Sequence, residues 1–250
     1  NPSEVLDHVL DVPEIVKRAE QSTAEYDAFL EMMNVYRLFG DGEIEVKNKT
    51  TGVVKNYNIS EREVKRQFLK TAMSVYILEG VRFYVSFACS WAFAETMKVL
   101  TKNEKIIKMI ARDENLHMAT LHQYFKHIAA GEEGAEMKEL YNELLPDFVE
   151  MFREAGVQEK EWAKYLFKDG SIIGLNAQIL GDYVEYIIDR RMKALGLKSL
   201  YGRSANPLPW TDHWIGSREA APPPQEVELT TYVVGGLDTS FEAGDFDDLI

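Results

Sequence analysis

The most restrictive feature of this sequence is an almost wholly apolar segment, residues 75–94, which carries two charged side chains, Glu79 and Arg82. About twenty apolar residues are enough for a helix to span a membrane. A charged residue inside a membrane span is costly, and the sequence holds no second segment of this kind. We therefore interpret the segment as the buried central helix of a soluble helical bundle, with no membrane as partner.

Helical periodicity divides most of the chain into long helices. These helices are expected over residues 13–40, 61–99, 101–130, 135–168 and 176–195. Two capping-box patterns support the boundaries, Ser60 with Glu63 and Thr101 with Glu104. Asp11 is a candidate cap for the first helix.

Two features interrupt the helical pattern. Pro146 predicts a break or kink within the fourth helix, because proline lacks the N–H that an interior helical position requires. Residues 43–57 consist of two short stretches with β-branched residues around a turn-rich segment, which predicts a small β-hairpin. The expected fold class is therefore all-α, with one hairpin.

Charge and composition exclude several functions. The net charge of −13 argues against nucleic-acid binding through a basic surface. Cys89 is the single cysteine, so no intrachain disulfide can form and a reducing, cytoplasmic location is expected. Residues 216–250 contain several acidic residues and no Lys or Arg after Arg218. They are expected to form a mobile acidic tail that orders on a partner, following a folded domain over residues 1–215.

Glu114 and His117 lie three residues apart, so both can point from one helix face to one metal ion. Glu is abundant here, and a solvated Glu beside a half-buried His would give the same spacing. Glu79 strengthens the metal interpretation, because a carboxylate in an apolar helix needs a metal or a partner such as Arg82. A Glu on one helix and a Glu-x-x-His on the next form half of a di-iron carboxylate pattern. Oxygen and imidazole ligands suit iron or manganese.

Nearby residues allow two interpretations each. Asp113 is either a solvated surface acid or an acceptor that orients a ligand histidine. Phe83 and Phe87 recur at helical spacing with later aromatic residues. They are core residues in the simpler interpretation, which we favour, and the dry wall of an oxidising metal site in the other.

Two long motifs, LEGVRFYVSFACSWAFAE at residues 78–95 and IARDENLH at 110–117, closely resemble the small, radical-generating subunit of class Ia ribonucleotide reductase. Residues 165–176, 206–210 and 225–232 are similar to that family too. The resemblance covers essentially the whole chain in order, and motifs of this length are highly specific.

The resemblance implies a ferritin-like helical fold, a homodimer and a di-iron centre beside a tyrosyl radical. In this family the radical passes to a large catalytic subunit, which reduces ribonucleotides to deoxyribonucleotides. Carried over by position, Glu79, Glu114 and His117 match metal ligands of the second half of the centre. Asp113 matches a carboxylate behind those ligands on the radical-transfer path.

The resemblance also implies roles for residues beyond the ligands. Phe83 and Phe87 match hydrophobic residues around the metals and the radical. Tyr232 matches a tail tyrosine that relays the radical, and Glu226 matches a tail acid that supports the transfer. Residues 246–250 match the segment that docks on the large subunit.

The chain also departs from the family pattern, which needs two sets of one carboxylate plus one Glu-x-x-His. Only one Glu-x-x-His is present, since His8 is preceded at the right distance by Val5. By resemblance, the first ligand set, the radical tyrosine and the tryptophan of the transfer path are missing. Neither Tyr76 nor Tyr84 matches the radical position. We therefore expect a split subunit, in which this chain is the C-terminal two-thirds and an N-terminal fragment completes the site and core.

Two other functions remain open. The chain could be a metal-free interaction or regulatory relic that keeps the dimer and tail surfaces. It could also be another ferritin-like oxidase or iron store, although residues 226–232 and the acidic tail serve no purpose in iron storage. No nucleotide pocket is expected, because no glycine-rich phosphate loop precedes a helix.

Overall fold

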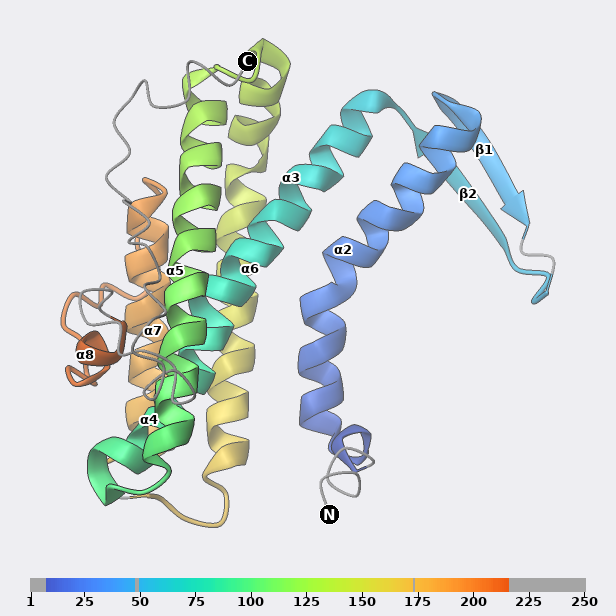
Figure 1. The fold of residues 1–250 in the computed structure, drawn as a ribbon. Coiled ribbons are helices and arrows are strands. Elements are labelled where there is room, and N and C mark those ends of the chain that lie inside the picture. Colours follow the sequence, from blue (N-terminus) through green and yellow to red (C-terminus); the bar gives the residue numbers. More distant parts are fainter. Residues whose placement is uncertain (1–7, 48–49, 173, 216–250) are drawn as a thin grey trace, which may run out of the picture.

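A computed structural model describes residues 8–47, 50–172 and 174–215, which form long helices and one hairpin (Figure 1). In chain order the elements are η1 (Val9–Asp11), α2 (Pro13–Phe39), β1 (Gly42–Lys47), β2 (Val54–Ile59), α3 (Glu61–Ile77), η2 (Leu78–Arg82), α4 (Phe83–Met97), α5 (Thr101–Ala130), α6 (Ala135–Leu166), α7 (Ala177–Ala194) and α8 (Thr211–Ile215). The all-α class with a small hairpin is confirmed.

The expected helix over residues 61–99 is confirmed as the continuous run α3, η2 and α4, with one feature that periodicity did not predict. Its middle turn, η2, is π-helical, and the Phe83 N–H donates to the Leu78 carbonyl five residues earlier. A π turn inserts one extra residue into a helix, and such turns frequently occur at functional sites. This turn contains Glu79.

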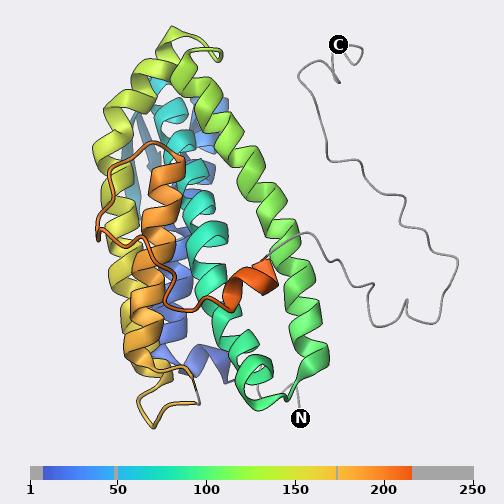
Figure 2. The ribbon, with the colours of Figure 1, turned by 90° about the vertical axis from the view of Figure 1, so that its left-hand side faces the viewer.

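The central helix lies between α5 on one side and α6 and α7 on the other (Figure 2). Tyr76 of α3 meets Phe125 of α5 and Phe152 of α6 edge-on, with ring centroids 6.1 and 6.4 Å apart. Within the described residues, Glu61–Met97 is the one helix long and apolar enough to cross a membrane, and 56% of its apolar window is buried in the protein. Its packing against three helices supports the interpretation as a core helix.

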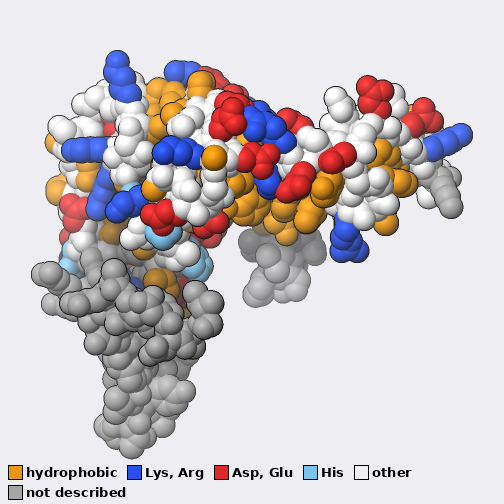
Figure 3. Space-filling view, turned by 90° about the horizontal axis from the view of Figure 1, so that it is seen from above, with side chains coloured by type: hydrophobic (Ala, Val, Ile, Leu, Met, Phe, Trp, Pro, Cys, Tyr) orange, Lys and Arg blue, Asp and Glu red, His pale blue; other side chains and the backbone are white. Residues whose placement is uncertain are grey.

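An arm extends from the bundle, formed by α2, the start of α3 and the hairpin (Figure 1). The antiparallel strands pair from Gly42 opposite Ile59 to Lys47 opposite Val54, which confirms the predicted hairpin. Hydrophobic side chains gather along this arm (Figure 3). Those of α2 that remain exposed are Tyr26, Leu30, Met33, Leu38 and Phe39.

Of the two predicted capping boxes, the first is confirmed in its N-cap hydrogen bond, since the Ser60 hydroxyl accepts the Glu63 N–H at 3.2 Å. The second is wrong. Thr101 is the first residue of α5, and the capping position is Leu100, which has a left-handed φ of 58° and no side-chain cap. The reason is the short connection from α4, where Lys98 is also left-handed and the chain reverses within three residues.

Two further expectations on helix boundaries are corrected. The Asp11 carboxylate contacts the His8 ring at 2.7 Å, and α2 starts after Val12 without a side-chain cap. Of the break or kink predicted at Pro146, the break is wrong, because α6 continues from Ala135 to Leu166. Leu144 and Phe148 on either side of Pro146 are fully buried, so tertiary packing holds the helix across the missing hydrogen bond.

Residues 216–250 lie outside the part of the chain that the structure describes. The expected mobile acidic tail, with Glu226, Tyr232 and residues 246–250, falls entirely within this segment. These expectations therefore stay predictions.

Candidate metal centre

The three predicted metal ligands meet at the middle of the bundle. The π turn brings Glu79 level with Glu114 and His117 of the neighbouring helix α5. The His117 Nδ1 atom lies 3.1 Å from a Glu114 oxygen and 3.5 Å from a Glu79 oxygen. One ligand atom from each residue lies within 4.8 Å of the other two. Two carboxylates and one imidazole can thus converge on a single cation.

The electrostatics of this cluster favour a bound cation. The Glu79 side chain is 17% exposed, and its second carboxylate oxygen is buried with no hydrogen-bond partner among the described residues. Burial, and next the charge of Glu114, raise the pKa of Glu79, while His117 acts in the opposite direction. A metal ion would neutralise both carboxylates and coordinate the unpaired oxygen. The donor set fits iron or manganese.

The simpler explanation of Glu79, an ion pair with Arg82, is wrong. The Arg82 guanidinium lies 3.0 Å from a Glu159 oxygen on α6 instead. Among the described residues, Glu79 therefore has no buried cation as partner, and its carboxylate faces α5.

The cluster is open on one side. The His117 side chain is 53% exposed, although it contacts both carboxylates. Its neighbour Leu116 is exposed as well, as are Ile106 and Ile110 earlier on α5. Helix α5 thus exposes three apolar side chains in the turns before and beside the cluster.

The other predicted site residues surround the cluster without joining it. The Asp113 side chain is 66% exposed, and its ion-pair partner is Arg112 at 3.8 Å. Phe83 and Phe87 lie one and two turns beyond Glu79, with ring centroids 6.0 Å apart. Phe87 is buried in one hydrophobic cluster with Trp91 of α4 and Ala111 of α5. The two phenylalanines thus line the contact between α4 and α5.

Several residues around the π turn were not predicted from the sequence. Arg191 of α7 donates its Nε–H to the Gly80 carbonyl at 3.0 Å. Arg18 of α2 and Glu159 of α6 contact the other end of the turn. No local sequence pattern indicates which residue on another helix each of these charged side chains contacts. One sequence signal was available for a close contact here, because Gly80 is a glycine within a helix directly after the buried carboxylate of Glu79.

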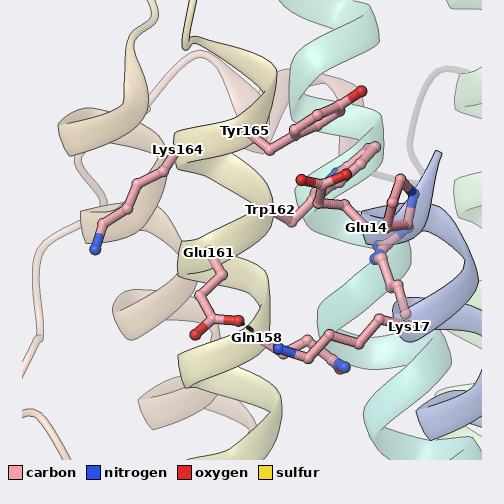
Figure 4. Close-up of a pocket in the computed structure, with 9 residues that line it drawn as sticks. Glu14, Lys17, Gln158, Glu161, Trp162, Lys164 and Tyr165 are labelled. Carbon is pink, nitrogen blue, oxygen red and sulfur yellow. Dashed lines mark hydrogen bonds and ion pairs between the residues drawn. The ribbon is translucent and has the colours of Figure 1, made fainter.

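A separate cavity of about 460 Å³ lies between α2 and α6 (Figure 4). Its lining includes Gln158, Trp162 and Tyr165 of α6, and Lys17 of α2 pairs with Glu161 across it at 2.9 Å. None of the predicted site residues that the structure describes lines this cavity. The carboxylate cluster therefore remains the candidate site.

Comparison with known proteins identifies the family. The family model for "Ribonucleotide reductase, small chain" matches residues 26–207. The chain belongs to the ribonucleotide reductase small-chain family. The ribonucleotide reductase R2 subunit from Clostridium botulinum has a similar fold, with a TM-score of 0.65 at 24% identity over 85% of this chain and 56% of that one. The expected ferritin-like helical fold of the family is thereby confirmed.

Curated relatives are β subunits of ribonucleoside-diphosphate reductases. The Haemophilus influenzae protein is 43% identical over 99% of this chain, and the Escherichia coli O157:H7 protein 42% over 98%. The bacteriophage T4 protein is 33% identical over 97% of this chain. The chain spans 64% of the length of the first of these relatives and 63% of each of the other two.

Replacing Glu79 with Gln should stabilise the metal-free protein. A carboxyl group whose pKa is raised by folding is destabilising where it is ionised, so the gain exists at neutral pH and fades as the pH falls through the carboxyl range. We expect Tm to rise by about 2–4 °C at pH 7 in chelator, the shift that about 1 kcal/mol gives in a chain of this size. Thermal unfolding at pH 7 and pH 4 checks this, with exposed Asp113→Asn as control. A lower Tm for Glu79→Gln at pH 7 would contradict the prediction.

Proposed function

We propose that this chain is part of the small subunit of a ribonucleoside-diphosphate reductase and contributes half of a di-metal centre. The centre would generate a tyrosyl radical that is relayed for the reduction of ribonucleotides to deoxyribonucleotides. The observation that carries the proposal is the convergence of Glu79, Glu114 and His117 in a chain of this family. Iron or manganese, when bound, would supply the oxidising chemistry, while these three side chains hold the metal.

Three ligands leave a two-metal centre about half coordinated. We propose that an N-terminal chain supplies the remaining ligands and the radical tyrosine, as in a split subunit. The support is the half-exposed side chain of His117, together with the exposed apolar side chains of Ile106, Ile110 and Leu116 on the same helix. A helix packed against the exposed side of α5 would cover some of this apolar surface and bring its own ligands to the centre. This chain would be active only in that complex.

The remaining roles rest on the family resemblance. Residues 1–215 would form the C-terminal portion of the ferritin-like domain, and residues 216–250 a tail that docks on the large catalytic subunit. Within the tail, Tyr232 would relay the radical and Glu226 would support the transfer. Asp113 would serve the same path beside the metal ligands. A second copy of the chain would complete a homodimer in the cytoplasm.

A native mass spectrum of the complex purified from its source, with metal analysis of the same sample, tests the proposal. We expect a second, smaller chain and two metal ions per complete site. This chain found alone and without metal would instead indicate an interaction or regulatory protein. A soluble monomer of these 250 residues that binds two irons by itself would overturn the split-subunit proposal.

A further inference from the structure

Arginines from two other helices bind the backbone of the π turn that carries Glu79. Arg191 of α7 donates its Nε–H to the carbonyl oxygen of Gly80 at 3.0 Å. Arg18 of α2 donates an Nη2–H to the carbonyl oxygen of Arg82 at 2.9 Å. The turn is thus held from opposite sides, one residue and three residues after the metal ligand.

Such contacts matter because a π turn is an uncommon alternative to the regular helix. In a regular helix each residue is rotated by about 100° from the previous one, at 3.6 residues per turn. Loss of the extra residue of the π turn would therefore rotate one half of the central helix by about this angle relative to the other. If α3 and α4 both kept their core contacts, Glu79 between them could then no longer face α5.

The guanidinium of Arg191 is itself fixed in place. It lies over the ring of Tyr84, with its central carbon 4.8 Å from the ring centroid. The Tyr84 ring is fully buried, and its hydroxyl donates to the side-chain amide oxygen of Asn115 on α5. Asn115 directly follows the metal ligand Glu114. Arg191 therefore links the π turn of one ligand to the helix of the other two.

The glycine at position 80 makes this close approach possible. A Cβ atom there would lie 2.6 Å from the Cε atom of Met118 and 3.2 Å from the Nε atom of Arg191. Any larger residue would force Met118 or Arg191 away from the turn. The absence of a side chain at Gly80 thus lets Arg191 reach its carbonyl oxygen.

Arg18 is oriented by a fully buried carboxylate. Two of its nitrogens donate to the two oxygens of Glu159, at 2.8 and 3.1 Å. This paired geometry leaves little freedom in the position of the guanidinium. The same Nη2 atom that contacts Glu159 also reaches the Arg82 carbonyl.

We propose that Arg191 is a positioning residue, which holds the π turn in the register that aims Glu79 at Glu114 and His117. Arg18 is the second support of the same turn. The inference rests on the proposed function of the cluster as a metal centre. It assigns to α7, which contributes no ligand of its own, a part in forming that centre.

The test measures the affinity of the metal-free complex for Co²⁺. An affinity tag on this chain allows the complex to be purified from its source cells. Three variants of the chain are compared with the unmutated one: Arg191→Met, Arg191→Lys and Arg190→Met. Loss of a residue that supports a metal ligand typically costs 10- to 100-fold in affinity. We expect Arg191→Met to weaken Co²⁺ binding by about this factor and to change the visible absorption of bound Co²⁺. Arg191→Lys, which keeps a charged donor, should restore part of the affinity. Arg190→Met is the matched control, because Arg190 is exposed and its nearest ion pair, with Asp212, is 4.0 Å long.

Hydrogen exchange separates this inference from the proposed function. In the metal-free complex, the amides of residues 80–84 should exchange faster in Arg191→Met than in the unmutated chain. If the unmutated complex binds no Co²⁺, the proposed metal centre fails, and the positioning role fails with it even if exchange shows that Arg191 holds the turn. Unchanged Co²⁺ affinity and absorption in Arg191→Met would overturn the positioning role alone, and so would unchanged exchange. If Arg191→Met does not fold, Arg191→Gln, which keeps an N–H donor, is compared with Arg191→Lys by the same measurements.

Discussion

Replacing Glu114 with Ala is expected to reduce the metal content of the assembled complex by more than half. Glu114 is one of the three proposed ligands that the described part of this chain brings together, and one of its oxygens lies 3.1 Å from the Nδ1 atom of His117. Without it, Glu79 and His117 remain as a pair with an open side. Elemental mass spectrometry of the purified complex measures the number of metal ions per complex directly.

The same substitution should leave the metal-free fold intact, which distinguishes a lost ligand from a lost structure. The charge of Glu114 contributes to the raised pKa of Glu79, so its removal relieves repulsion within the bundle. We therefore expect the Tm of the metal-free Glu114→Ala complex to be no lower than that of the unmutated one. Asp113→Ala is the control, because this neighbour is exposed and outside the cluster. Unchanged metal per complex in Glu114→Ala would refute the ligand role.

The parts of the fold that sequence predicted well are those set by local patterns. The apolar run around Glu79 required a buried helix, and the Ser60–Glu63 pattern marked where that helix begins. Only part of the cluster was predictable from such local patterns. The spacing of Glu114 and His117 fixes their common face within one helix, whereas the burial cost of Glu79 left Arg82 and a metal both open as its partner.

The features that sequence missed depend on contacts between distant segments. The π turn at Leu78–Arg82 has no compositional signature, because its carbonyls are bound by arginines more than sixty residues away in each direction. Leu100 takes the capping position of α5 because the chain must reverse between two packed helices. This packing outweighs the local preference for Thr101 as the capping residue. In both cases tertiary packing overrides a local preference.

The assignment of partners to charged residues shows the same limit. Glu79 and Arg82 lie three residues apart and could have paired on one helix face. The extra residue of the π turn separates them, so that Glu79 faces α5 and Arg82 faces Glu159 on α6. An acid and a base in the same helix thus face two different sites, the candidate metal centre and the buried pairing of Glu159 with Arg18 and Arg82.

Replacing Glu159 with Ala should therefore cost about 3–5 kcal/mol of folding free energy, as expected when one partner of a buried ion pair is removed. The Glu159 side chain is 0% exposed and pairs with both Arg18 and Arg82. Its loss leaves the buried Arg82 guanidinium without a counter-charge. For a chain of this size the corresponding fall in Tm is about 6–20 °C.

Glu161→Ala gives the matched comparison, because Glu161 lies on the same helix and its ion pair with Lys17 is exposed on both sides. An exposed pair contributes about 0–1 kcal/mol, so its loss should change Tm by a few degrees at most. A Glu159→Ala variant no less stable than Glu161→Ala would contradict the assignment. The double replacement Glu159→Met with Arg82→Met should recover part of the loss, because it removes the unpaired charge together with its partner.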